Sequence, residues 1–157
     1  MPVMKHRYFF SLLILSLSLF LSCDNVADNS CSGVICDAPM FTIGLEYLDA
    51  ESGENLLFGE DPSYSIDDLS AVSLESDQEY FVTPDSTLTD KKIALIYGSL
   101  SDVIKLSLGD LSVDTLYVNA LYRDVGCCGE IVLQEVQLND KIICTDCEDF
   151  PVVEILK

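Results

Sequence analysis

Hydrophobic and polar positions alternate along the chain from Met40 onward. Every second residue is apolar in FTIGLEY, residues 41–47, and this period of two is typical of a half-buried strand. Long stretches with the helical period of 3.6 are absent, and one helical turn is expected only near Ile66. The other strand candidates are residues 71–74, 79–83, 92–97, 103–108, 115–122, 131–138, 142–143 and 151–156.

Turn-forming sequences separate these short strands at intervals of about eight to twelve residues. Examples are DAESGEN at 49–55, TPDST at 83–87 and LNDK at 138–141, where Pro, Gly, Asn and Asp favour tight turns. Many short strands at this spacing predict an all-β fold, an antiparallel β-sandwich that is immunoglobulin-like or related. An open barrel is the second choice.

The first residues follow a different pattern. Lys5, His6 and Arg7 form a short positive segment, and Phe9–Leu21 is an uncharged run of thirteen apolar and Ser residues. This length fits the hydrophobic region of a signal peptide and is shorter than the roughly 20 apolar residues that span a bilayer. The pattern predicts export of the chain.

The end of this run, Phe20-Leu21-Ser22-Cys23, resembles the lipobox of bacterial lipoproteins. The resemblance implies that the signal peptide, residues 1–22, is removed and that Cys23 carries a diacylglycerol thioether, often with an acylated amine. Two or three acyl chains hold a protein on a membrane almost permanently. We therefore expect residues 23–39 to be a lipidated tether and residues 40–157 to be the folded domain.

The charge of the chain is strongly negative. It holds 27 acidic and eight basic residues, with a formal net charge of −19 at pH 7. Lys5 and Arg7 leave with the signal peptide, so the mature chain is more acidic still. Such a surface repels nucleic acid and anionic lipid headgroups, and we therefore expect no binding to nucleic acid.

Seven cysteines in a small exported chain predict disulfides. With Cys23 assigned to lipid, an even number remains. The six residues are Cys31, Cys36, Cys127, Cys128, Cys144 and Cys147. The preferred arrangement pairs Cys31 and Cys36 with Cys127 and Cys128 and leaves Cys144 bonded to Cys147. The alternative bonds Cys31 to Cys36 and pairs Cys127 and Cys128 with Cys144 and Cys147.

Three further segments, CSGVIC, FTIGLEYLDAESGENLLF and the late CCG, resemble small exported lipoproteins of Bacteroidota-type bacteria. The resemblance covers most of the mature chain. It implies a lipid anchor and one sandwich domain, and it implies no activity.

The mature chain lacks histidine, since His6 is the only one. A Ser-His-Asp or Cys-His catalytic site and a His-ligated zinc site are therefore excluded. The C-x-x-C sequence at Cys144–Cys147 is surrounded by Asp and Glu, which disfavours the reactive thiolate that redox catalysis needs. We expect no catalytic residue and no enzyme activity, and we expect this pair to form a structural bridge.

Two ligand classes stay open. Hard cations bind clustered oxygens, and the loop GEDPSYSIDD supplies four carboxylates as calcium candidates, although it matches no known calcium loop. Sugars stack on aromatic rings, and Tyr64 in the same loop is the aromatic residue that we most expect to be exposed. The calcium candidates are Glu60, Asp61, Asp67 and Asp68.

The expected function is that of a binding or structural module of the cell envelope, with a carbohydrate- or calcium-binding accessory module as the alternative. No resident cofactor is expected, apart from the calcium option. The expected partners are the lipid bilayer, through Cys23, and an envelope protein or polysaccharide. The expected location is the outer membrane of a bacterium, on its periplasmic or surface face.

Overall fold

The computed structural model describes residues 31, 33–85, 87, 92–147 and 150–157. The chain divides into two units, Met1–Val34 and Ile35–Lys157, and the second unit holds the fold. In the first unit the described residues form a turn in which Val34 N donates to Cys31 O at 3.1 Å. The elements of the second unit are β1 (Phe41–Leu48), the 3-10 helix η2 (Ile66–Asp68), β2 (Leu69–Ser73), β3 (Val82–Asp85), β4 (Ile93–Gly98), β5 (Asp102–Leu108), β6 (Asp114–Val125), β7 (Cys128–Leu138), β8 (Lys141–Cys147) and β9 (Val152–Leu156).

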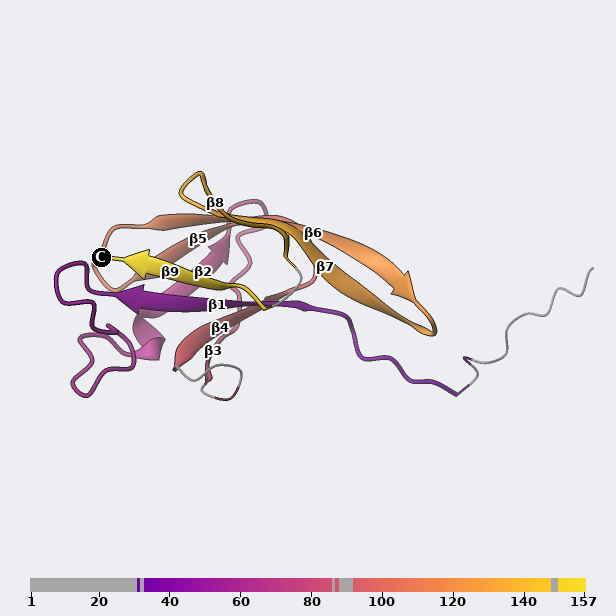
Figure 1. The fold of residues 1–157 in the computed structure, drawn as a ribbon, viewed down its shortest axis with the longest axis horizontal. Coiled ribbons are helices and arrows are strands. Elements are labelled where there is room, and N and C mark those ends of the chain that lie inside the picture. The colour runs from indigo at the N-terminus through magenta and orange to yellow at the C-terminus, as the bar shows by residue number, and fades with distance from the viewer. Residues whose placement is uncertain (1–30, 32, 86, 88–91, 148–149) are drawn as a thin grey trace, which may run out of the picture. The chain divides into compact units, whose positions relative to one another are not determined.

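These strands form two sheets, which confirms the predicted all-β sandwich (Figure 1). One sheet has the order β3-β4-β1-β9 and the other β2-β5-β6-β7-β8. The pairings are antiparallel except that of β1 with β9, which is parallel. Because β1 pairs with both β4 and β9, the first strand lies inside its sheet. In the immunoglobulin constant-type order the first strand lies at an edge. The fold is a sandwich with its own strand order.

The core lies between the two sheets and consists of the apolar residues that alternate along each strand. On β1, Ile43, Leu45 and Tyr47 are fully buried, as the alternation in the sequence predicts. Gly44 and Glu46 are buried too, so the expectation of a half-buried strand was wrong. Leu56 and Leu57 contribute from a loop and not from a strand. The facing residues of the second sheet include Ile104, Leu106, Leu108, Leu116, Val118 and Val136.

The segment between β2 and β3, residues 74–81, leaves one sheet and joins the other, and we call it the crossing segment. Ser73 N donates to Gln78 O at 2.9 Å and Tyr80 N to Ala71 O at 2.8 Å, so this segment first runs beside β2. The strand expected at 79–83 instead begins at Val82. The reason is that residues 79–81 form part of the crossing between the sheets.

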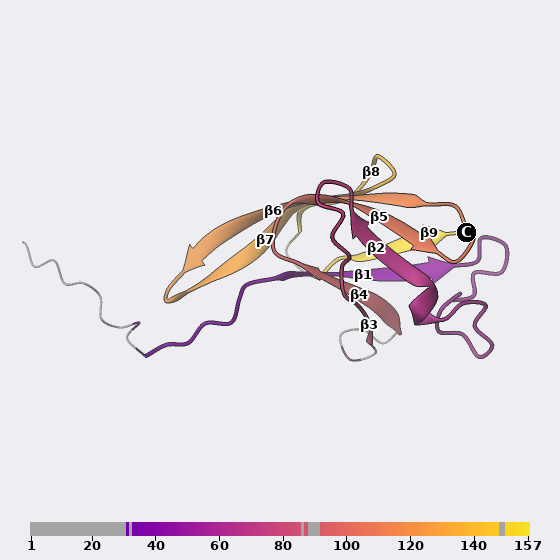
Figure 2. The ribbon, with the colours of Figure 1, turned by 180° about the vertical axis from the view of Figure 1, so that it is seen from behind.

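The hairpin of β6 and β7 extends beyond the other strands, as both views show (Figures 1 and 2). Its pairing shifts between Asn119 and Ala120, where Gln134 on the partner strand is skipped. Such a bulge bends a strand and increases its twist. Up to this point β6 alternates buried and exposed residues, and beyond it residues 121–125 are exposed. We call residues 120–133 the arm.

The predicted turn in LNDK connects β7 and β8. Asn139 and Asp140 both have positive φ, 49° and 65°, the geometry of the tight turn that matches the twist of a hairpin. Asn139 also fixes the neighbouring strand, because its Oδ1 accepts from Thr115 N at 2.8 Å.

Candidate functional site

A groove of about 810 Å³ lies where the crossing segment meets the turn between β4 and β5. Met40, which precedes β1, completes its border. The sequence pattern does not reveal this site, because its residues come from three segments that the alternation does not connect. The lining includes Met40, Ser73, Glu75, Glu79, Tyr80, Phe81, Tyr97, Leu100, Ser101 and Asp102.

Asp102, the first residue of β5, holds the wall of the groove in place. Its Oδ2 accepts from the Tyr80 hydroxyl at 2.6 Å, and its Oδ1 accepts from Ser73 Oγ at 3.0 Å and from Val103 N at 2.6 Å. Partial burial, with the hydrogen bond to Asp102 as a second cause, raises the pKa of Tyr80. Tyr80 therefore remains a protonated donor at neutral pH.

Ser73 extends this network into the next turn. Its side chain is almost completely buried, and its Oγ accepts from Glu75 N at 3.2 Å and from Ser76 N at 3.1 Å. This turn is completed by Asp77, which has a φ of 56°. One carboxylate and one hydroxyl thus fix the conformation of the loop that borders the groove.

Ser101 fixes the opposite border. Ala120 N donates to Ser101 Oγ at 2.8 Å, and this hydroxyl donates to Ala120 O at 3.0 Å. Ala120 is the first residue after the bulge of β6, so the turn between β4 and β5 is connected to the point where the arm begins.

The rim of the groove exposes large apolar side chains. Phe81 and Leu100 are each 75% exposed and Met40 is 58% exposed. Single exposed apolar residues are ordinary, but three that border one groove indicate a contact surface. The charged residues of the lining are all acidic: Glu75, Glu79 and Asp102.

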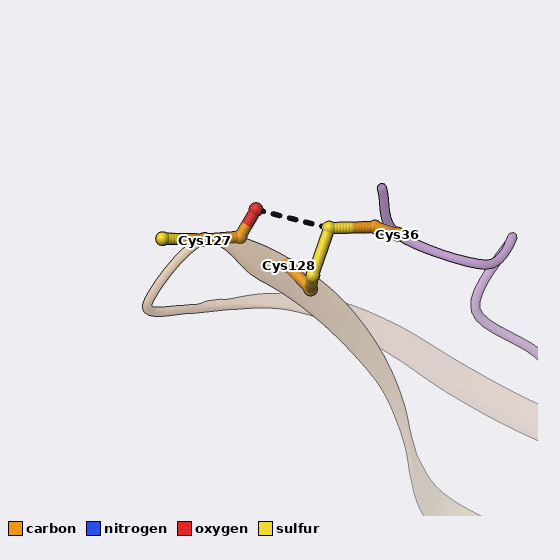
Figure 3. The surroundings of a disulfide bond; sticks show 3 residues. All are labelled: Cys36, Cys127 and Cys128. Atoms are coloured by element: carbon orange, nitrogen blue, oxygen red, sulfur yellow. Dashed lines mark hydrogen bonds between the residues drawn. A yellow bond between two sulfur atoms is a disulfide. The ribbon is translucent and has the colours of Figure 1, made fainter. Parts of the chain in front are cut away.

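A disulfide between Cys36 and Cys128 joins the segment before β1 to the tip of the arm, with a Cα–Cα distance of 5.6 Å (Figure 3). Cys36 Sγ also lies 3.2 Å from the carbonyl oxygen of Cys127. Because a bridged sulfur carries no proton to donate, this is a close contact and not a true hydrogen bond. The Cys127 side chain points away from Cys36.

The second disulfide, Cys144–Cys147, lies within β8, and both residues pack against the core. Cys31 is also disulfide-bonded, and so is Cys127. Three disulfides are thus at bonding distance. The bridges Cys36–Cys128 and Cys144–Cys147 follow the preferred arrangement, and the alternative with a local Cys31–Cys36 bridge was wrong.

The calcium candidates do not converge. Asp68 accepts from Ser65 N at 2.8 Å and caps η2, while Asp67 N donates to Ser65 Oγ at 3.3 Å. Glu60 and Asp61 line a different hollow from Asp67. Within the ranges that the structure describes, no group of three or more His, Cys, Asp or Glu side chains is placed to hold a metal ion. Asp68, one of the four candidate ligands, is instead used to cap η2.

Tyr64 is half-buried, so the expectation of an exposed ring was wrong. Its hydroxyl donates to Asp110 Oδ1 at 3.0 Å, and this bond is the main cause of its raised pKa. Its ring lies over Gly109, where a Cβ atom would be 2.5 Å from the ring and where φ is +54°. The ring thus closes a turn.

A buried ion pair lies away from the groove. Lys157 Nζ is 2.5 Å from Asp114 Oδ2, and both side chains are less than a tenth exposed. Lys157 Nζ also donates to Ser112 O at 2.6 Å, and Asn139 Nδ2 donates to Asp114 Oδ1 at 2.8 Å. The neighbouring Tyr47 hydroxyl is buried without a hydrogen-bond partner among the described residues. Burial, with the charge of Asp114 as a second cause, raises the pKa of Tyr47.

Cys23 and the preceding hydrophobic run lie outside the described residues. In the described part of the chain, no helix combines the length and apolar composition that crossing a membrane requires. Comparison of the chain with family models, with curated proteins and with solved structures finds no match in any of the three.

Proposed function

We propose that this protein is an exported, membrane-anchored binding module that takes its ligand in the groove beside Asp102. The observation that carries the proposal is the groove itself, in which a hydrogen-bonded wall, fixed by Asp102 and Ser73, stands next to the exposed side chains of Phe81 and Leu100. A rigid polar support beside exposed apolar groups is typical of binding sites that are formed before the ligand arrives.

Two features support the exported location. The hydrophobic run before Cys23 resembles a lipoprotein signal peptide, and the three disulfides fit an oxidising compartment. The anchor would hold the domain at the membrane surface, so a partner in the same envelope would meet the groove at a high local concentration.

The location is tested by the mass of the protein purified from its native membranes. We expect residues 1–22 to be missing and Cys23 to carry acyl groups, and we expect a Cys23→Ser variant to lack them and to leave the membrane fraction. A full-length, unacylated chain would contradict the anchor.

Binding in the groove is tested by photo-cross-linking in intact cells. A photoreactive amino acid replaces Leu100 at the groove, and in a matched control it replaces Leu156, which is 65% exposed on β9. Leu156 pairs with Leu48 at the end of β1, whereas the groove lies beside Met40 before its start. We expect a defined adduct from position 100 alone. The same adducts from both positions, or none from either, would refute binding at this site.

A further inference from the structure

The polar groups at the centre of the groove already have partners. Asp102 accepts three hydrogen bonds, and the hydroxyls of Ser73 and Ser101 are both engaged within the fold. A sugar, which needs many hydrogen-bond partners, would have to compete with these bonds. The central groups therefore support the wall and do not select a polyhydroxyl ligand.

The apolar rim offers a different kind of contact. Phe81, Leu100 and Met40 together present aromatic and aliphatic surface at the rim of the groove. Burial of such side chains is the dominant favourable term in most protein association. A ligand with one or two apolar side chains would thus gain most of its binding energy here.

The charge at the groove is negative and uncompensated by its lining. Glu75 and Glu79 are exposed on the crossing segment, and Asp102 is half-buried at the start of β5, whereas no Lys, Arg or His contributes to the lining. The chain as a whole is also acidic, with a formal net charge of −19 at pH 7. Such a field attracts cations, repels anions and gives specificity through complementary charge.

From these three observations we infer that the groove binds a basic amphipathic segment of a partner protein, in which Lys or Arg residues lie next to Leu or Phe. The apolar side chains pack on Phe81 and Leu100, and the cationic groups face Glu75 and Glu79. This inference rests on the proposed function, because it names the ligand class of the same groove.

The probe is a short fluorescent peptide of Lys and Leu, and its counterpart contains Glu in place of Lys. Binding to the full mature chain is measured by fluorescence anisotropy. One variant carries Glu75→Lys with Glu79→Lys, and a matched control carries Glu51→Lys with Glu54→Lys. The control changes the net charge equally, but its positions lie in the loop after β1, at the other end of that strand from Met40.

We expect the Lys–Leu peptide to bind and the Glu–Leu peptide to fail. The substitutions at the groove should weaken binding at least about tenfold, equivalent to about 1.4 kcal/mol, and the control pair should weaken it much less. Phe81→Ser should also weaken binding, with a melting temperature close to that of the parent. Equal losses in both charge variants would mean general attraction to an acidic surface, and this would overturn the inference.

A parallel titration with neutral oligosaccharides separates this inference from the proposed function. Oligosaccharide binding that Phe81→Ser abolishes, with no binding of the Lys–Leu peptide, would leave the groove as the site and overturn the ligand class. If neither probe binds and Leu100 forms no adduct in cells, the proposed function fails together with the inference.

Discussion

The Tyr80 hydroxyl donates a 2.6 Å hydrogen bond to Asp102, and this bond joins the crossing segment to the first residue of β5. Removing it with Tyr80→Phe should lower the free energy of unfolding by about 1.5–3 kcal/mol, the range for hydrogen bonds to charged groups. Urea unfolding under oxidising conditions measures this. Tyr117→Phe, on an exposed position of β6, is the control and should change stability by less than about 0.5 kcal/mol. Equal effects would mean that the bond does not hold the groove wall.

The buried pair of Asp114 and Lys157 should show strong energetic coupling. Lys157→Met leaves a buried carboxylate without its cation, and we expect a loss of about 3–5 kcal/mol. Asp114→Asn combined with Lys157→Met should recover part of this loss, because no charge then remains buried. Lys141→Met, on an exposed residue of β8, is the control. If the single and double variants are additive in chemical denaturation, the two charges do not interact.

Tyr47 should make stability fall at alkaline pH. Its folded-state pKa lies above the ordinary value of 10.0, because burial disfavours the phenolate. The unfolded chain therefore loses this proton first, so the contribution is complete below pH 10 and decreases as the pH rises further. We expect the difference in unfolding free energy between the parent and Tyr47→Phe to change by up to about 1.4 kcal/mol per pH unit in this range. A difference that stays constant with pH would contradict the buried hydroxyl.

The turn between β7 and β8 should respond in opposite ways to two glycine substitutions. Asp140→Gly relieves a positive φ and should raise the melting temperature slightly, by an amount equivalent to about 0.5–1 kcal/mol. Asn139→Gly also relieves a positive φ, but it removes the side-chain bonds to Thr115 and Asp114 and should destabilise the fold. If both variants are stabilised, backbone strain outweighs these bonds.

The long-range disulfide should matter more than the local one. Cys36–Cys128 spans 92 residues and Cys144–Cys147 spans three, and the entropy of the closed loop grows with its length. Loss of the long closure should cost about 4–5 kcal/mol, and loss of the short one about 2 kcal/mol. The long closure is tested by replacing Cys31, Cys36, Cys127 and Cys128 with Ala together, so that no other bridge keeps this loop closed. Equal guanidinium midpoints for this variant and for one that lacks the Cys144–Cys147 bridge would contradict the expected order.

The fold class was predictable because burial on one face of a strand leaves a period of two in the sequence. The alternation in 41–47 gave β1, and the Asn and Asp of LNDK gave the last hairpin turn. The parallel pairing of β1 with β9 was not predictable, because partner choice between distant strands leaves no local pattern.

The groove could not be predicted for a related reason. Tyr80 and Asp102 lie 22 residues apart, and only the crossing between sheets brings them together. The loop acids were the more visible signal, but Asp68 is used to cap η2. Exposed apolar residues such as Phe81 are informative only after the fold shows which of them share one surface.

If the chain is anchored through Cys23, as we propose, the disulfide from Cys36 to Cys128 has a mechanical consequence. At Cys36 a pull from the N-terminal side divides between the backbone that leads to β1 and the disulfide that leads to the tip of the arm, so part of the load falls on the ladder of β6 and β7. Residues 37–40, which follow Cys36, would then carry only part of this load. Met40, at the border of the groove, would thus feel a reduced pull, and so would a ligand bound in the groove.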